Sequence, residues 1–141
     1  MPASIQCTCS VSDDLRWHCQ WATLSTEAKV DRHVAFSVTP PEFIGIINYL
    51  QGILGHPAES IPRPRLGSTS IRLRYRRKAK LFELQVRGET EVLNGMVDEP
   101  QLARILSYHK SCLQAYAIAV YEGRVPIPEG YPQGYPEPHW G

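Results

Sequence analysis

Long apolar runs are missing from this sequence. A membrane-spanning helix needs about 20 consecutive apolar residues, whereas the longest candidate, FIGIINYLQGILG, is interrupted by Asn48 and Gln51. The start, MPASIQCTCS, has neither the basic region nor the apolar core that a signal peptide carries. We therefore expect no membrane association, and a protein of the cytoplasm or of another reducing intracellular compartment.

Enzyme signatures are also absent. The sequence has no G-x-S-x-G, no phosphate-binding P-loop, no G-x-G-x-x-G and no H-E-x-x-H. Asp13 and Asp14 lie side by side in a polar stretch, where aspartate favours turns through its own hydrogen bonds. His33 and His109 have no nucleophile near them in the sequence. We expect a protein that is not an enzyme and that needs no cofactor.

Cysteine is sparse, with four residues in a chain of 141. Zinc sites usually place two to four residues between paired cysteines in a turn. Cys7 and Cys9 are separated by one residue, and they share a strand-like alternation, as does Cys19 further along. At 43% hydrophobic residues the chain is large enough for a core without disulfides. We predict that these cysteines and Cys112 pack as small apolar side chains, without a metal.

The alternation of apolar and polar residues predicts three strands and a helix, and then the same order again. A strand has a period of two and an amphipathic helix a period of 3.6. The segment FIGIINYLQGIL has helical spacing, and Gly55 and Pro57 end it. The predicted strands are 5–11, 15–24, 32–38, two strands around a turn near Lys78 within 71–88, and 90–97; the predicted helices are 40–55 and 99–123.

Both predicted helices begin with the same signal. Thr39 and Asp98 are N-cap residues, and Glu42 and Gln101 follow each of them at the third position, as in a capping box. Beyond the caps, Ile46, Ile47 and Tyr49 align with Ile105, Leu106 and Tyr108. These matches indicate a structural repeat rather than two unrelated helices.

The sequence therefore predicts an α+β fold of two pseudo-symmetric repeats, each with antiparallel strands followed by a helix. We expect a single domain over residues 1–123, with repeats at about 4–55 and 68–123 and a proline-rich connector at 56–67. Residues 124–141 are rich in Pro, Gly and Tyr and predict an extended C-terminal arm.

The segment AFSVTPPEFIGIINYL resembles the corresponding strand, turn and helix of the Whirly family and of the related transcriptional-coactivator fold. The resemblance implies two repeats of strands and a helix, with single-stranded nucleic acid held against the sheets. That family normally has four strands per repeat, where this sequence predicts three, and its lysine-glycine-rich motif is not found in an early strand here. No binding residue is transferred from the family.

Positive charge is concentrated in one part of the chain. Nine basic residues and one acidic residue, Glu83, lie between positions 63 and 87, although the net charge of the whole chain is only +1. Positive charge on a strand face and its adjoining loop is typical of phosphate binding. We predict that single-stranded DNA or RNA binds there with little sequence specificity. The predicted contact residues are Arg63, Arg65, Arg72, Arg74, Arg76, Arg77, Lys78 and Lys80.

Two alternatives remain open for the function. The basic strand face could serve only to keep the protein soluble or to protect a sheet edge, although one lysine normally suffices for protection. The C-terminal arm, where Tyr131, Tyr135 and Trp140 lie among prolines, instead indicates a protein-binding adaptor or inhibitor. The arm and the exposed sheet edges also predict a homo-oligomer.

Overall fold

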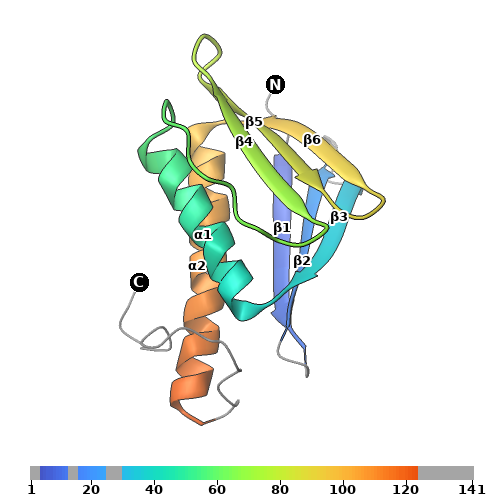
Figure 1. Ribbon diagram of the computed structural model, residues 1–141, viewed down its shortest axis with the longest axis vertical. Coiled ribbons are helices and arrows are strands. Elements are labelled where there is room, and N and C mark those ends of the chain that lie inside the picture. The colour runs from blue at the N-terminus through green and yellow to red at the C-terminus, as the bar shows by residue number, and fades with distance from the viewer. Residues whose placement is uncertain (1–3, 13–15, 25–29, 124–141) are drawn as a thin grey trace.

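The structure, a computed structural model, describes residues 4–12, 16–24 and 30–123. It contains two three-stranded antiparallel sheets, ordered β1-β2-β3 and β4-β5-β6, and two helices (Figure 1). The predicted α+β class is confirmed, as is the order of three strands and a helix in each half. The elements are β1 (Ser4–Val11), β2 (Trp17–Leu24), β3 (Val30–Val38), α1 (Pro40–Gly55), β4 (Ser70–Arg76), β5 (Leu81–Arg87), β6 (Val92–Val97) and α2 (Glu99–Tyr121).

Strand alternation gives each sheet one buried face. In β2, Trp17, Cys19 and Trp21 are at most 2% exposed, whereas His18 and Gln20 point to the opposite, exposed face. In β5, the central strand of the second sheet, every second residue is buried along the whole strand. Because successive side chains of a strand point to opposite faces, this pattern follows directly from the sequence.

The start of α1 is fixed by the predicted capping box. The Thr39 hydroxyl accepts a hydrogen bond from the Glu42 N–H at 3.3 Å, and the Thr39 N–H donates to the Glu42 carboxylate at 2.8 Å. At α2 only the N-cap half of the predicted box is present among the described residues, where Asp98 accepts from the Gln101 N–H at 2.9 Å. Both bonds satisfy N–H groups that have no partner inside the helix.

Each helix is bonded to the first strand of the other half. The Tyr49 hydroxyl of α1 accepts a hydrogen bond from the Leu73 N–H of β4 at 2.9 Å. The Tyr108 hydroxyl of α2 accepts one from the Cys9 N–H of β1 at 2.8 Å. Both β1 and β4 are edge strands. The two tyrosines, which align in the sequence, thus satisfy edge-strand N–H groups in corresponding places.

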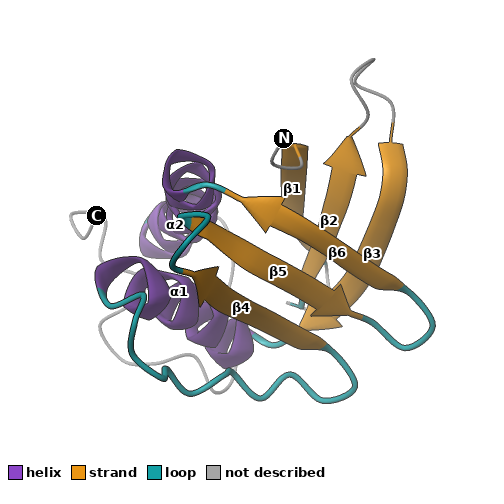
Figure 2. Cartoon of the chain, turned by 90° about the horizontal axis from the view of Figure 1, so that it is seen from above, coloured by secondary structure: helices purple, strands orange, loops and turns teal. Residues whose placement is uncertain are grey.

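One hydrophobic core joins the two sheets and the two helices (Figure 2). The Trp17 ring of β2 stacks on Phe43 of α1 with ring centroids 4.0 Å apart, and its edge meets Tyr116 of α2 at 5.5 Å. At the junction of the sheets, the turn after β5 lies against β3. A Cβ atom added to Gly88 would stand 3.1 Å from the Val34 side chain, so glycine permits this close approach.

Some predictions fall outside the described residues. The C-terminal arm at 124–141 is one of them, together with the aspartate pair and Leu15 ahead of β2. Within the described part of the chain, neither helix is long and apolar enough to cross a membrane.

Candidate nucleic-acid interface

Three arginines project from the outer face of β4. Arg72, Arg74 and Arg76 are exposed, while Ile71 and Leu73, which alternate with them, are at most 6% exposed. The sheet therefore separates the guanidinium groups from the core, as the sequence predicts. A change at these arginines alters surface charge without removing a core side chain.

The turn between β4 and β5 carries three more cations, Arg77, Lys78 and Lys80, all exposed. It projects from the top of the molecule in Figure 1, beyond the ends of both helices. Lys80 has a φ of 54°, in the left-handed region that favours glycine and costs other residues about 1–2 kcal/mol. A lysine therefore occupies a position where glycine would be less strained, and its positive charge is kept at the tip.

One of the strand arginines is already paired. Arg76 Nε donates to Glu83 of β5 at 2.7 Å, and both side chains are about half exposed. Exposed ion pairs of this kind contribute little to stability and are screened by salt. Arg72 and Arg74 instead line a shallow recess of about 110 Å³ with Glu83 and Gln85.

The connector brings a further arginine to the same strand. Arg63 lines a cavity of about 440 Å³ together with Arg72, Arg74 and Arg77. Arg65 does not line this cavity, and lies instead with Arg63 on a neighbouring recess of about 600 Å³. All eight predicted residues are thus exposed, and four of them meet around one cavity.

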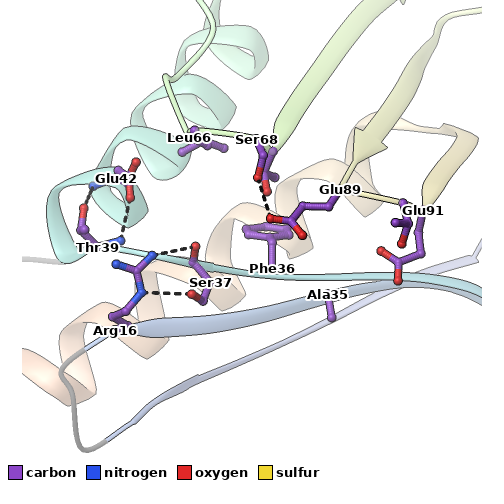
Figure 3. A pocket seen from close by; sticks show the side chains of 13 residues that line it. Arg16, Ala35, Phe36, Ser37, Thr39, Glu42, Leu66, Ser68, Glu89 and Glu91 are labelled. Atoms are coloured by element: carbon purple, nitrogen blue, oxygen red, sulfur yellow. Dashed lines mark hydrogen bonds between the residues drawn. The ribbon is translucent and has the colours of Figure 1, made fainter.

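The opposite end of the second sheet has a different character. A pocket of about 650 Å³ lies there between β3, the start of α1 and the turn after β5 (Figure 3). Its walls carry Glu42, Glu89 and Glu91, several hydroxyls and one cation, Arg16. Arg16 donates to the Ser37 hydroxyl at 3.0 Å and to the Ser37 carbonyl at 3.1 Å. Its three carboxylates make this pocket less favourable for a phosphate than the arginine-lined cavity of 440 Å³.

The four cysteines gather where β1 and β2 meet α2. Cys9 interacts with Cys19 and Cys112. The hydrogen bond from Cys112 lowers the pKa of Cys9, but the bond to Cys19 and burial outweigh it and the net pKa is raised. The hydrogen bond to Cys9 and burial raise the pKa of Cys112, and burial raises that of Cys7. Cys7, Cys9 and Cys112 are therefore thiols at neutral pH. No set of His, Cys, Asp or Glu within the described ranges is arranged to hold a metal ion.

Sequence reasoning missed the aromatic part of the site. Tyr49 and Tyr75 both line the 440 Å³ cavity beside the arginines. The alternation places Tyr75 on the buried face of β4, but it lies near the end of this edge strand and is only half-buried. The sequence did offer one sign of a partly exposed aromatic residue, because Tyr75 lies between Arg74 and Arg76. Tyrosine has an apolar ring and a polar tip, so it is found at the boundary between core and solvent.

The residues predicted for protein binding, Tyr131, Tyr135 and Trp140, lie outside the described part of the chain. No protein-family model matches this sequence, and a comparison with curated proteins finds no match.

Proposed function

We propose that this protein binds single-stranded nucleic acid through the outer face of β4, the turn that follows it and the connector, with little sequence specificity. The observation that carries the proposal is the convergence of Arg63, Arg72, Arg74 and Arg77 around one cavity at the edge of that face. Arginine offers several fixed N–H donors, which suit phosphate oxygens, and its planar group also stacks on bases.

The distribution of charge supports the same surface. Arg76, Arg77, Lys78 and Lys80 lie at or beside the turn at 77–80, whereas Glu89 and Glu91 lie at the other end of the second sheet. A strand of phosphates is attracted to the first region and repelled from the second. Phosphate contacts position a strand without reading its bases, so we expect weak sequence preference.

The composition of the sheet face favours a single strand over a duplex. Arg72 of β4 pairs with Gln85 of β5, which in turn pairs with Asn94 of β6. In the same way, Arg74 pairs with Glu83, and Glu83 pairs with Met96. Met96 is partly exposed, and the Gln85 and Asn94 side chains are hydrogen-bonded at 3.1 Å. Polar amides and an apolar thioether can contact unstacked bases, which a duplex keeps inside its helix.

The proposal is tested by titrating a fluorescent single-stranded oligonucleotide at several salt concentrations. Contacts to roughly four phosphates predict a slope of about −3 in the plot of log affinity against log salt. A duplex of the same sequence serves as competitor. Equal competition by the duplex would overturn the preference for single strands, and no binding of a folded sample at low salt would overturn the proposal.

Charge reversal locates the surface. We expect the triple variant R72E/R74E/R76E to lose binding without loss of folding, because all three side chains leave the core. The single variants Arg74→Glu and Arg104→Glu form a matched pair, since Arg104 of α2 is exposed but lines none of the three recesses that the predicted arginines share. Equal losses in this pair would show a dependence on net charge alone and would contradict the assignment to β4.

A further inference from the structure

The cavity along the edge of β4 has the size of a site for one small molecular group. It measures about 440 Å³, within the roughly 300–1,000 Å³ that is usual for ligand pockets. One side is formed by β4, another by the end of α1 and the third by residues 57–61 of the connector. A chain of phosphates alone would not need a hollow of this size.

Part of the inner wall of the cavity, formed by Tyr49, Ile53 and Ile61, is apolar and firmly placed. Tyr49 and Ile53 of α1 are at most 5% exposed. The Tyr49 hydroxyl is fixed by its bond to the Leu73 N–H at 2.9 Å, which holds the helix against the strand. Ile61 of the connector, half-buried, lies on the facing side and also touches Gly52 of α1, where a Cβ would stand 3.1 Å from it. These walls suit a flat apolar group and do not have to be rearranged to admit it.

Tyr75 supplies an aromatic surface at the same cavity. Its ring packs on Phe82 of β5, with centroids 5.0 Å apart and planes inclined by 47°. Phe82 is 2% exposed, so one side of the Tyr75 ring is supported by the core while the residue itself remains half-exposed. Arg74, from the outer face of β4, and Arg77, from the turn that follows, line the same cavity. An aromatic ring next to guanidinium groups is the combination on which nucleobases stack in proteins that bind single strands.

We propose that this cavity takes one splayed-out nucleotide of the bound strand, with its base against Tyr75 and its phosphates on the arginines that line the cavity. This inference rests on the proposed function and adds a site for a base to a surface for phosphates. Glu59 lies on the connector side of the cavity, across from the arginines of β4. Its carboxylate repels phosphate, so the backbone of the strand lies on the β4 side.

The test compares an oligothymidylate with an otherwise identical oligonucleotide that lacks all its bases. We expect the protein to bind the oligothymidylate more tightly, and the variant Tyr75→Leu to lose about tenfold of that affinity, as for one lost base-stacking contact. Affinity for the abasic oligonucleotide should be the same for both proteins. Tyr75→Phe, which keeps the ring, should restore binding, and Tyr121→Leu is the control because Tyr121 is 71% exposed at the end of α2. Thermal melting of each variant shows that it is folded.

The outcomes separate this inference from the proposed function. If neither oligonucleotide binds, the proposed function fails. If both bind equally well and Tyr75→Leu changes neither, the phosphate surface stands and the base site is overturned. If thymidine monophosphate alone binds as tightly as the oligothymidylate, the cavity is a site for a free nucleotide and the proposal of a strand is overturned.

Discussion

His109 of α2 shows how a single residue can combine a polar group with a fully buried position. It is 0% exposed, and its Nδ1–H donates to the Ile105 carbonyl at 2.7 Å. Its ring neighbours are the uncharged Trp21, Phe43 and Tyr108. Within the part of the chain that the structure describes, the Nε2 atom has no hydrogen-bond partner. Burial lowers the pKa of His109 to about 4, although the bond to Ile105 raises it slightly.

This burial predicts a loss of stability in mild acid. Between the unfolded pKa of about 6.5 and the folded pKa of about 4, the unfolded chain binds a proton that the folded chain does not. The free energy of unfolding therefore falls as the pH drops through this window, by up to about 3 kcal/mol. Urea unfolding at several pH values between 4 and 7 measures the change.

The variant His109→Leu tests whether this residue is the cause. It removes the titrating group and keeps an apolar side chain in the core, so the slope of stability against pH between 4 and 6.5 should become shallower. A substitution at the exposed His56 is the control and should leave the slope as it is. An unchanged slope in His109→Leu would assign the acid sensitivity to other groups.

At the scale of elements, the two tyrosine hydroxyls each accept a hydrogen bond from a strand at the edge of a sheet. An edge strand presents unpaired N–H and C=O groups to which another chain can add. Tyr49 accepts from Leu73 on β4, and Tyr108 accepts from Cys9 on β1. Each bond occupies one N–H group on one edge of its sheet, so another chain could not pair with the strand at that position.

Removing one of these hydroxyls should destabilise the fold without changing its shape. Tyr49→Phe leaves the buried Leu73 N–H without its acceptor, and an unsatisfied buried donor costs about 1–3 kcal/mol. Tyr121→Phe is the matched control because Tyr121 is 71% exposed. Urea unfolding of both variants measures the difference, and the midpoint of Tyr49→Phe should be the lower one. Equal midpoints would mean that the Tyr49 bond contributes nothing measurable to stability.

At the scale of the whole molecule, self-association remains a prediction that depends on the C-terminal arm and on the sheet edges. The tyrosine bonds satisfy one N–H group on β1 and one on β4, so the rest of these edges, together with residues 124–141, are the reasons to expect a homo-oligomer. Pro- and Tyr-rich segments lose little conformational entropy when they dock, and their rings supply contact area.

Sedimentation of the full chain and of a truncated chain ending at Gly123 tests this prediction. We expect the full chain to sediment as an oligomer and the truncated chain as a monomer. A monomeric full chain would refute self-association, whereas two oligomers of the same size would place the interface on the folded domain instead of the arm.

The sequence by itself determined the order of elements, the helix starts and the two faces of each strand. These features are local: alternation follows from the geometry of a strand, and the bonds of Thr39 and Asp98 join residues three positions apart. The separation of Arg72 and Arg74 from Leu73 is of the same kind.

Only the tertiary structure decided what surrounds those arginines. The cavity combines the end of α1, the connector and β4, so it depends on how segments distant in the sequence pack. The same holds for Tyr75, whose place on the buried face was predictable but whose exposure at a sheet edge was not. The alternation of side chains between the two faces of a strand depends on a few neighbouring residues. The burial of a residue on an edge strand depends instead on which other elements cover that edge.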